Sequence, residues 1–510
     1  MATRDAFHEA LERASDDDFD ALYRAGVAAT GVGRFEPVRN RIAPLMNGAA
    51  ARDARLWQVL GLAERGLQDA AAAHAAFARA AELAPRDPLI AHSHARTALE
   101  AGYDALDLFA RAQALRPNDG ELLLGRAAAQ LAGGMADRAL TDLAELLAAN
   151  PGWIAGHTTY AQVAAASGRK ARAFETIDAA LARDPGGGEL HRTKVRLHME
   201  ADDHASARAA AETAIATFGH SAELDETLAI ALSESGECAA AQAIFATLPP
   251  PAQASSAVWR VRTLIRLGRI DEAIVDAEIR WPGDADRLLW PYRALLWRLV
   301  GDPRWDWLEG DPRLIGVFDL AEGIGPISAL AGLLRAMHTG KGQPLDQSLR
   351  GGSQSDGVLL ARAEPEIRRL RSAILEAVAA HVAQLPPPAL DHPTLLATRA
   401  PLRLGGSWSV RLAGSGFHVD HVHPMGWLSS ALYVALPGGM ATGAGDPHAG
   451  WLTFGENRAL VPGLSAFRLV EPRPGRLVLF PSTMWHGTRP FAAGERLTVA
   501  FDVARPVAPQ

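Results

Sequence analysis

The segments ALTDLAELLAANP, residues 139–151, and AFETIDAALARDP, residues 173–185, begin 34 positions apart, and both end on a proline. Two earlier segments end in the same way, AAHAAFARAAELAP at residues 72–85 and LFARAQALRP at residues 108–117. Small turn residues recur between these prolines at nearly the same interval: Gly134, Gly168, Asp202, Gly236 and Gly268. Because glycine or aspartate can end one helix and proline can stop the next, this period predicts stacked helix–turn–helix units.

The repeated units resemble the tetratricopeptide repeat family, whose helix pairs have about this period. About six or seven such units would fit between Arg55 and Arg280. We therefore predict that residues 1–300 form an all-α tetratricopeptide-repeat array. Stacked helix pairs build an extended concave surface, so the array is either a plain scaffold or a groove for a peptide or protein partner. The sequence leaves both possibilities open.

The stretch between the helical part and the C-terminal part is rich in tryptophan, proline and Gly-Asp turns, in residues 281–314. Large aromatic side chains seldom lie in solvated linkers, so we expect a packed junction here. Two predicted helices follow, at residues 329–340 and 364–385, and the second of them is amphipathic. We interpret residues 301–400 as this junction together with helices that support the next domain.

From Leu402 onward the chain consists of short apolar runs separated by glycine and proline. Examples are GSWSVRLAG at residues 406–414, GWLSSALYVALPGG at 426–439 and RLVLFPSTMWHGTRPF at 476–491. Roughly six strands at this spacing predict an all-β sandwich or barrel over residues 401–510. The chain is therefore expected to be multidomain, with helical repeats first and a β domain last.

Candidate metal ligands gather in two of these runs. The motif FHVDHVHP holds four of them: His418, Asp420, His421 and His423. A fifth candidate, His486, lies in FPSTMWHGTRPF. Residues at i and i+2 of a strand point to the same side, so His418 with Asp420, or His421 with His423, could bind one metal ion. The two pairs face opposite sides of the strand, so both cannot bind the same ion unless a bulge intervenes. Either pair with His486 leaves open coordination positions, which suits non-haem Fe(II).

These motifs together resemble the Fe(II)/2-oxoglutarate-dependent dioxygenases, and more narrowly the bacterial putative 2OG-Fe(II) oxygenase family. The resemblance rests on GFHVDHVHPMGWLSSALYVALP, LVLFPSTMWHGTRPF and ERLTVAFDV, in that order, and covers roughly residues 400–505. It implies a double-stranded β-helix (jelly-roll) fold that binds Fe(II), 2-oxoglutarate and O₂. The usual chemistry of such enzymes converts 2-oxoglutarate to succinate and hydroxylates a C–H bond of a substrate.

The resemblance also bears on which residues bind iron. A ligand pair followed by a proline turn and a strand is typical of these oxygenases, and HVHP before MGWLSS has that form. We therefore favour His421, His423 and His486 as metal ligands, with His418 and Asp420 as the alternative pair. In the favoured set His423 stands where most oxygenases have a carboxylate. Either three histidines hold the iron, or His423 is not a ligand and a water completes the site.

The cosubstrate site follows from the same resemblance. The far carboxylate of 2-oxoglutarate needs a cation inside the barrel, and arginine binds a carboxylate in bidentate fashion. Arg496 and Thr498 lie two residues apart on a predicted strand, so guanidinium and hydroxyl share one face. Tyr433, on the strand SSALYVAL, is a further candidate to reach 2-oxoglutarate, with core packing as its other reading.

Composition limits the other classes of function. The chain has 510 residues and a net charge of −7, without the concentrated basic surface that nucleic-acid binding needs. Its one cysteine excludes an intrachain disulfide framework and a cysteine-based metal site. No apolar run is long enough for a membrane span, and we expect a cytoplasmic protein.

The leading hypothesis is thus a dioxygenase whose repeat domain recruits a peptide, protein or small-molecule substrate. The alternatives are a catalytically inactive repeat scaffold with a ligand-sensing β domain, and a cupin-like metal protein that is not an oxygenase.

Overall fold

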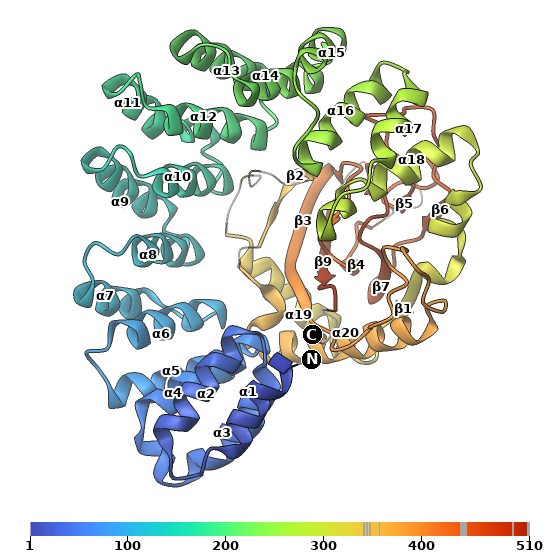
Figure 1. Cartoon of the computed structure of the whole chain (residues 1–510). Helices are drawn as coiled ribbons and strands as arrows, with labels where there is room; N and C mark the ends of the chain where they lie inside the picture. Colours follow the sequence, from blue (N-terminus) through green and yellow to red (C-terminus); the bar gives the residue numbers. More distant parts are fainter. Residues whose placement is uncertain are drawn as a thin grey trace. The chain divides into compact units, whose positions relative to one another are not determined.

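The computed structural model of the chain describes residues 2–339, 342, 345, 348–355, 357–438, 446–491 and 494–506. These residues, whose helices and strands are labelled in Figure 1, divide into two compact units. The first contains residues 1–139 and 356–374, and the second contains residues 140–355 and 375–506. Contacts thus group the later helical repeats with the β domain, whereas the predicted division into residues 1–300, 301–400 and 401–510 follows composition and remains a prediction.

The first unit is built of short antiparallel helices. Several of them begin at an aspartate whose side chain accepts backbone N–H groups of the first turn, as Asp53, Asp69, Asp87 and Asp119 do. Its helices are α1 (Ala2–Arg13), α2 (Phe19–Gly31), α3 (Phe35–Ile42), α4 (Ala54–Gly66), α5 (Ala70–Leu83), α6 (Pro88–Glu100), α7 (Leu106–Leu115) and α8 (Gly120–Ala132).

The helical part of the second unit continues the same pattern. Its helices are α9 (Ala136–Ala149), which begins in the first unit, α10 (Ile154–Ala166), α11 (Glu175–Arg183), α12 (Gly188–Glu200), α13 (His204–Phe218), α14 (Ala222–Glu234), α15 (Cys238–Thr247), α16 (Ala254–Arg266) and α17 (Ile270–Glu278).

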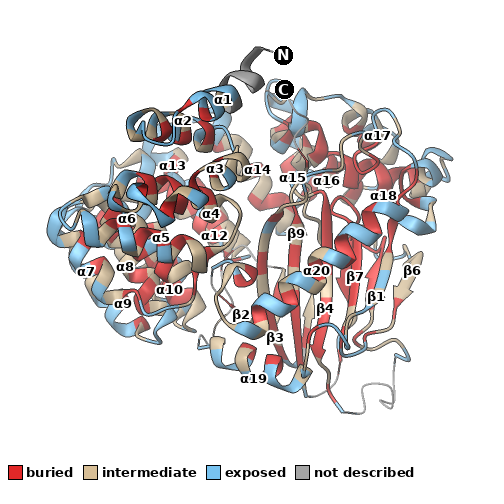
Figure 2. Cartoon of the chain, turned by 90° about the horizontal axis from the view of Figure 1, so that it is seen from below, coloured by how far each residue is buried: buried red, intermediate tan, exposed pale blue. Residues whose placement is uncertain are grey.

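The predicted turn residues all adopt the left-handed backbone conformation, with φ between 53° at Asp202 and 88° at Gly236. Each helix of the array has a buried face (red in Figure 2). Small alanines such as Ala207, Ala211 and Ala229 are among the fully buried residues. The predicted helical repeat array is confirmed.

Two antiparallel sheets form the β domain. The larger has the order β1-β7-β4-β9-β3-β2, and the smaller has the order β6-β5-β8. The strands are β1 (Gly316–Asp319), β2 (Leu349–Gln354), β3 (Leu404–His418), β4 (Leu428–Ala435), β5 (Leu452–Phe454), β6 (Arg468–Val470), β7 (Arg476–Pro481), β8 (His486–Thr488) and β9 (Glu495–Val503). Apolar side chains of both sheets pack together, among them Val478, Phe480 and Phe454. This arrangement is consistent with the expected jelly roll.

Three further helices accompany the sheets: α18 (Trp290–Val300), α19 (Ile327–Met337) and α20 (Pro365–Gln384). The second half of α20 runs across one face of the large sheet in Figure 2, where His381 packs against Phe318 of β1. On one side of the junction, α16 and α18 share an apolar cluster with Trp485, whose indole N–H donates to the Pro291 carbonyl over 2.9 Å. The residues of this stretch are packed, and they tie the last repeats to the strand that carries His486, while their role as a junction between domains remains a prediction.

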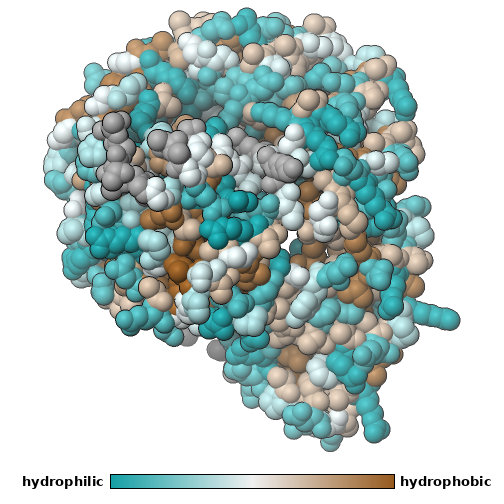
Figure 3. Space-filling model, turned by 180° about the vertical axis from the view of Figure 1, so that it is seen from behind, coloured by the Kyte–Doolittle hydropathy of each residue, from teal (hydrophilic) through white to brown (hydrophobic). Residues whose placement is uncertain are grey.

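The surface carries polar and apolar residues side by side. On the face shown in Figure 3, hydrophilic side chains surround small apolar groups. Among the helices that the structure describes, none has the length and hydropathy that crossing a bilayer requires.

A candidate metal centre inside the β domain

Three histidines meet between the two sheets. His421 and His423 lie in the segment between β3 and β4, and His486 is the first residue of β8. One potential ligand nitrogen from each ring lies within 4.8 Å of the other two. The backbones of His421 and His486 exchange two hydrogen bonds, of 2.9 and 3.1 Å, which form an isolated β-bridge. This bridge fixes the distance between two histidines that are 65 positions apart.

The predicted location of the ligand pair on a strand is wrong in one respect. Strand β3 ends at His418, and the residues after it are not part of a regular strand. The alternation rule that made the two candidate pairs mutually exclusive therefore does not apply to His421 and His423, whose ring centroids lie 5.0 Å apart. The bridge places His421 beside His486, and the backbone N–H of His423 donates to the Ser482 carbonyl over 2.8 Å, which holds the segment near β8.

The second ring nitrogen of each histidine is held by a hydrogen-bond acceptor. Nδ1 of His421 lies 2.7 Å from the Val419 carbonyl, and Nδ1 of His486 lies 3.0 Å from the Met484 carbonyl. A carbonyl oxygen can only accept, so Nδ1 carries the proton in both rings and Nε2 keeps its lone pair. Nδ1 of His423 lies 3.0 Å from the Asp502 carboxylate, which has the same consequence.

Burial keeps the imidazoles of His421 and His486 in the neutral form that binds metals. Burial lowers the pKa of His421 to about 3, and the neighbouring His423 acts in the same direction. Burial, with His421 and His423 nearby, also lowers the pKa of His486 well below its ordinary value. Both rings are therefore neutral at neutral pH, which is the state required of a histidine ligand.

The alternative pair is arranged differently. The Asp420 carboxylate is 3% exposed and forms an ion pair of 2.7 Å with Arg458, whose backbone N–H also donates to it over 2.8 Å. Asp420 therefore does not join the histidine cluster. His418 does line the same cavity, but its Nδ1 lies 3.1 Å from the Ser348 hydroxyl, which is also 3.2 Å from Nε2 of His421.

The cavity also contains a buried guanidinium. Arg496 of β9 is 2% exposed, and burial lowers its pKa. Its Nη1 donates to the Gly450 carbonyl over 3.0 Å, while its Nε has no hydrogen-bond partner, and the described residues offer it no ion pair. Tyr433 lies beside it, with the guanidinium carbon 5.0 Å from the ring centroid, and the Tyr433 hydroxyl also lacks a partner among these residues. A buried charge without a counter-ion fits a site for a carboxylate ligand.

The cavity that joins these groups has a volume of about 630 Å³. The three histidines, Arg496 and Thr498 line it from the β domain. Its wall also includes side chains of the helical repeats, which composition and motif gave no reason to expect: Met199, Glu200, Asp202 and Arg262. Asp202 had been identified only as a turn residue, and Arg262 belongs to no recognisable motif. The repeat array and the β domain thus enclose one cavity within a single compact unit.

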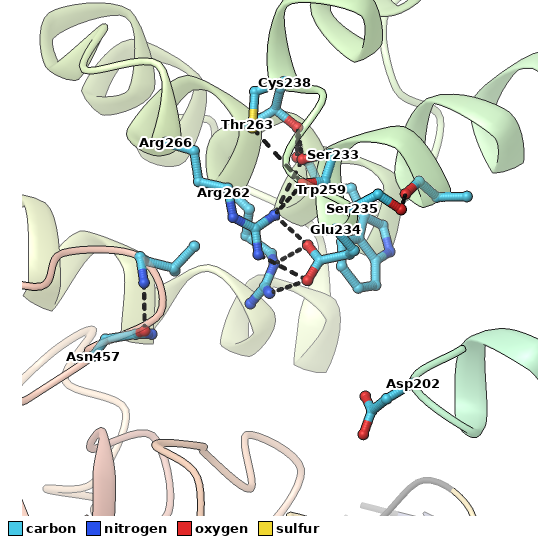
Figure 4. A network of polar contacts seen from close by, with 12 residues as sticks. Asp202, Ser233, Glu234, Ser235, Cys238, Trp259, Arg262, Thr263, Arg266 and Asn457 are labelled. Atoms are coloured by element: carbon cyan, nitrogen blue, oxygen red, sulfur yellow. Dashed lines mark hydrogen bonds and ion pairs between the residues drawn. The ribbon is translucent and has the colours of Figure 1, made fainter. Parts of the chain in front are cut away.

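Arg262 is fixed by an ion-pair network between α14 and α16 (Figure 4). Glu234 receives hydrogen bonds of 2.8 Å from Nη2 of both Arg262 and Arg266. Burial acts to raise the pKa of Glu234, but the two guanidinium groups outweigh it and hold this pKa at about 2. One carboxylate thus faces two arginines, and these three groups together have a net charge of +1.

Comparison with known proteins agrees with this arrangement. Residues 406–502 match the model of the family described as "Putative 2OG-Fe(II) oxygenase", and residues 198–265 match a tetratricopeptide repeat model. No curated protein matches the chain.

Two solved structures resemble part of the chain. The structure titled "Crystal structure of YrrB: a TPR protein with an unusual peptide-binding site" is 18% identical, covers 37% of this chain and 97% of its own, and has a TM-score of 0.30. A structure of MamA protein is 14% identical, covers 32% of this chain and 91% of its own, and has a TM-score of 0.29. At such low TM-scores these two structures carry no argument. The repeat pattern and the two family models show that the chain joins tetratricopeptide repeats to a C-terminal segment, residues 406–502, that matches the family described as "Putative 2OG-Fe(II) oxygenase".

Proposed function

We propose that this protein is an Fe(II)- and 2-oxoglutarate-dependent dioxygenase that hydroxylates a substrate held between its helical repeats and its β domain. The observation that supports this most is the combination in one cavity of three converging histidines and the buried Arg496 without a carboxylate partner. An iron site needs the first feature, and a dicarboxylic cosubstrate needs the second.

Each group has a defined role in this proposal. The Nε2 atoms of His421, His423 and His486 hold the metal, and Arg496 with Thr498 binds the far carboxylate of 2-oxoglutarate. Tyr433 packs beside the guanidinium and keeps water away from it. When bound, iron and 2-oxoglutarate would supply, with O₂, the oxidising power for hydroxylation of a C–H bond. The chain itself binds and orients these groups, and it contributes no nucleophile.

Addition of Fe(II) and 2-oxoglutarate to the full chain without oxygen tests this proposal. We expect a weak visible charge-transfer band, because both groups would meet in one cavity. Admission of O₂ should then produce succinate, even without a substrate. If 2-oxoglutarate binds but no succinate forms, the β domain is a ligand sensor. If no band appears, the proposed cofactor site is wrong.

We also propose that the substrate is a peptide or protein segment. The support is that α12, the turn after it and α16 of the repeat array contribute to the cavity wall. A substrate that reaches the histidines therefore touches the repeats as well, and an extended segment can follow the concave surface of stacked helix pairs. Arg262 offers a hydrogen-bonding cation at this wall.

Replacement of Arg262 by methionine tests the role of the repeats. Glu234 keeps Arg266 as its counter-ion, so the variant leaves no unpaired buried carboxylate. We expect succinate formation without substrate to stay unchanged, because Arg262 does not belong to the proposed metal or cosubstrate groups. Stimulation of that reaction by active peptides from a synthetic array should fall about tenfold, the equivalent of one lost charged hydrogen bond of about 1.5 kcal/mol.

The control is Arg208→Met, which removes an exposed arginine that pairs with Glu212 on α13 and does not line the cavity. It should respond to the same peptides as the wild type does. Equal stimulation of the Arg262 variant and the wild type would exclude a contact with Arg262. Stimulation by small metabolites alone would exclude a peptide substrate.

A further inference from the structure

The three clustered histidines differ in the group that accepts the hydrogen bond from Nδ1. His421 and His486 donate from Nδ1 to backbone carbonyls, which are neutral acceptors. His423 donates from Nδ1 to the Asp502 side chain on β9, over 3.0 Å. Of these three rings, His423 is therefore the one whose Nδ1–H is bonded to a negatively charged side chain.

The position of Asp502 is fixed by neighbours that are neutral. Its Oδ1 accepts a hydrogen bond of 2.6 Å from the Ser429 hydroxyl, which lies 2.9 Å from the Ser482 hydroxyl. Trp408 lies parallel to the His423 ring, with a centroid distance of 5.8 Å and an angle of 4° between the planes. Within the part of the chain that the structure describes, no lysine or arginine forms an ion pair with Asp502. Its negative charge is therefore directed at His423.

A carboxylate behind a histidine ligand has a known physical effect. It fixes the ring orientation and the tautomer, and it raises the basicity of the nitrogen that faces the metal. A facial site of two histidines and one carboxylate reduces the charge of a bound Fe(II) by one unit. Three neutral imidazoles leave that charge uncompensated, which disfavours the oxidised form of the metal.

We propose that Asp502 is a positioning residue that supplies, through His423, the negative charge that a carboxylate ligand supplies in other facial sites. The inference rests on the proposed function, since it takes His423 as a ligand. It assigns to the site a fourth residue, which lies 79 positions from His423 and outside the HVHP and FPS motifs. It also explains how a site of three histidines can hold Fe(II) without a carboxylate of its own.

Replacement of Asp502 by asparagine tests this inference. The amide oxygen can still accept the hydrogen bond from His423, so the change removes the charge and keeps most of the shape. We expect the affinity of the oxygen-free protein for Fe(II), measured by titration without 2-oxoglutarate, to fall about 10–100-fold. The midpoint potential of the bound iron should rise, because the ferric form loses a stabilising charge.

Glu495→Gln is the matched control. Glu495 lies on the same strand, carries the same charge and pairs with Arg335 and Arg411 rather than with the cavity. Its replacement should leave the Fe(II) affinity and the potential unchanged. A second variant, Ser429→Ala, keeps the charge of Asp502 but removes the hydroxyl that orients it. The Fe(II) affinity of Ser429→Ala should lie below that of the control and above that of Asp502→Asn. If Asp502→Asn folds poorly, a loss of Fe(II) affinity in Ser429→Ala relative to the control tests the inference instead.

The outcomes separate this inference from the proposed function. If the wild type binds Fe(II) tightly and Asp502→Asn binds it equally well at the same potential, Asp502 has no role and the dioxygenase proposal stands. If the wild type does not bind Fe(II), the proposed function fails and this inference fails with it. A parallel loss of affinity in Glu495→Gln would show a general charge effect and would also overturn the inference.

Discussion

Replacement of His486 by alanine should abolish tight Fe(II) binding by the full chain. His486 joins the cluster from a different sheet than β3 and β4, and it is the partner to which His421 is bridged. Loss of a ligand should cost more than the roughly 10–100-fold that loss of an outer partner costs. Anaerobic titration with Fe(II), followed by the absence of the charge-transfer band with 2-oxoglutarate, measures this effect.

His418→Ala is the control for this prediction. The His418 ring lies 5.9 Å from the His421 ring and contacts the Ser348 hydroxyl, but it is not one of the three residues whose ligand atoms converge, so its removal should change Fe(II) affinity only slightly. Loss of Fe(II) binding in His418→Ala, together with intact binding in His423→Ala, would contradict the assignment. The ligand set would then be the alternative one that includes His418 and Asp420.

Replacement of Arg496 by methionine should remove 2-oxoglutarate binding and leave Fe(II) binding intact. Truncation of one partner of a buried, hydrogen-bonded charge pair costs about 2–5 kcal/mol, or roughly 30-fold to several thousand-fold in Kd. The arginine lies deep in the cavity, so no water can replace it fully as a partner of the carboxylate. Titration of the iron-loaded protein with 2-oxoglutarate, followed by the charge-transfer band, measures the loss.

Arg411→Met controls for the loss of a positive charge. Arg411 lies on the neighbouring strand β3 and pairs with Glu495 at the surface of the domain, over 2.6 Å. Its replacement should leave 2-oxoglutarate affinity unchanged. Unaltered 2-oxoglutarate affinity in Arg496→Met would mean that another group binds the far carboxylate, and the proposed cosubstrate site would be wrong.

The helical repeats could be predicted because their signal is local. A proline that stops a helix and a residue that adopts positive φ act on their own turns, and Asp202 and Gly236 show this conformation in the structure. The candidate ligands were likewise recognisable from short motifs. Which of these candidates lie together was harder to predict. The alternation of side chains along a strand does not apply to His421 and His423, because both follow the end of β3.

The parts of the site that sequence reasoning missed depend on contacts between distant segments. Arg262 reaches the cavity because α16 packs beside Tyr292 and Trp485 in one apolar cluster. Asp502 reaches His423 because β9 pairs with β4, which follows the histidine segment. Asp502 lies in the motif ERLTVAFDV, but nothing in that motif links it to His423, and Arg262 lies outside the motifs that mark the site. Only the tertiary structure brings Arg262 to the cavity and Asp502 to His423.

The most direct test of the proposed metal site is a crystal structure of the full chain grown with Mn(II) as an oxygen-stable substitute for Fe(II). Anomalous scattering locates the metal without assumptions about its ligands. We predict one manganese ion within bonding distance of Nε2 of His421, His423 and His486. Nδ1 of His423 should still donate its hydrogen bond to the Asp502 carboxylate. A manganese ion bound to Asp420, or no metal between the sheets, would contradict it.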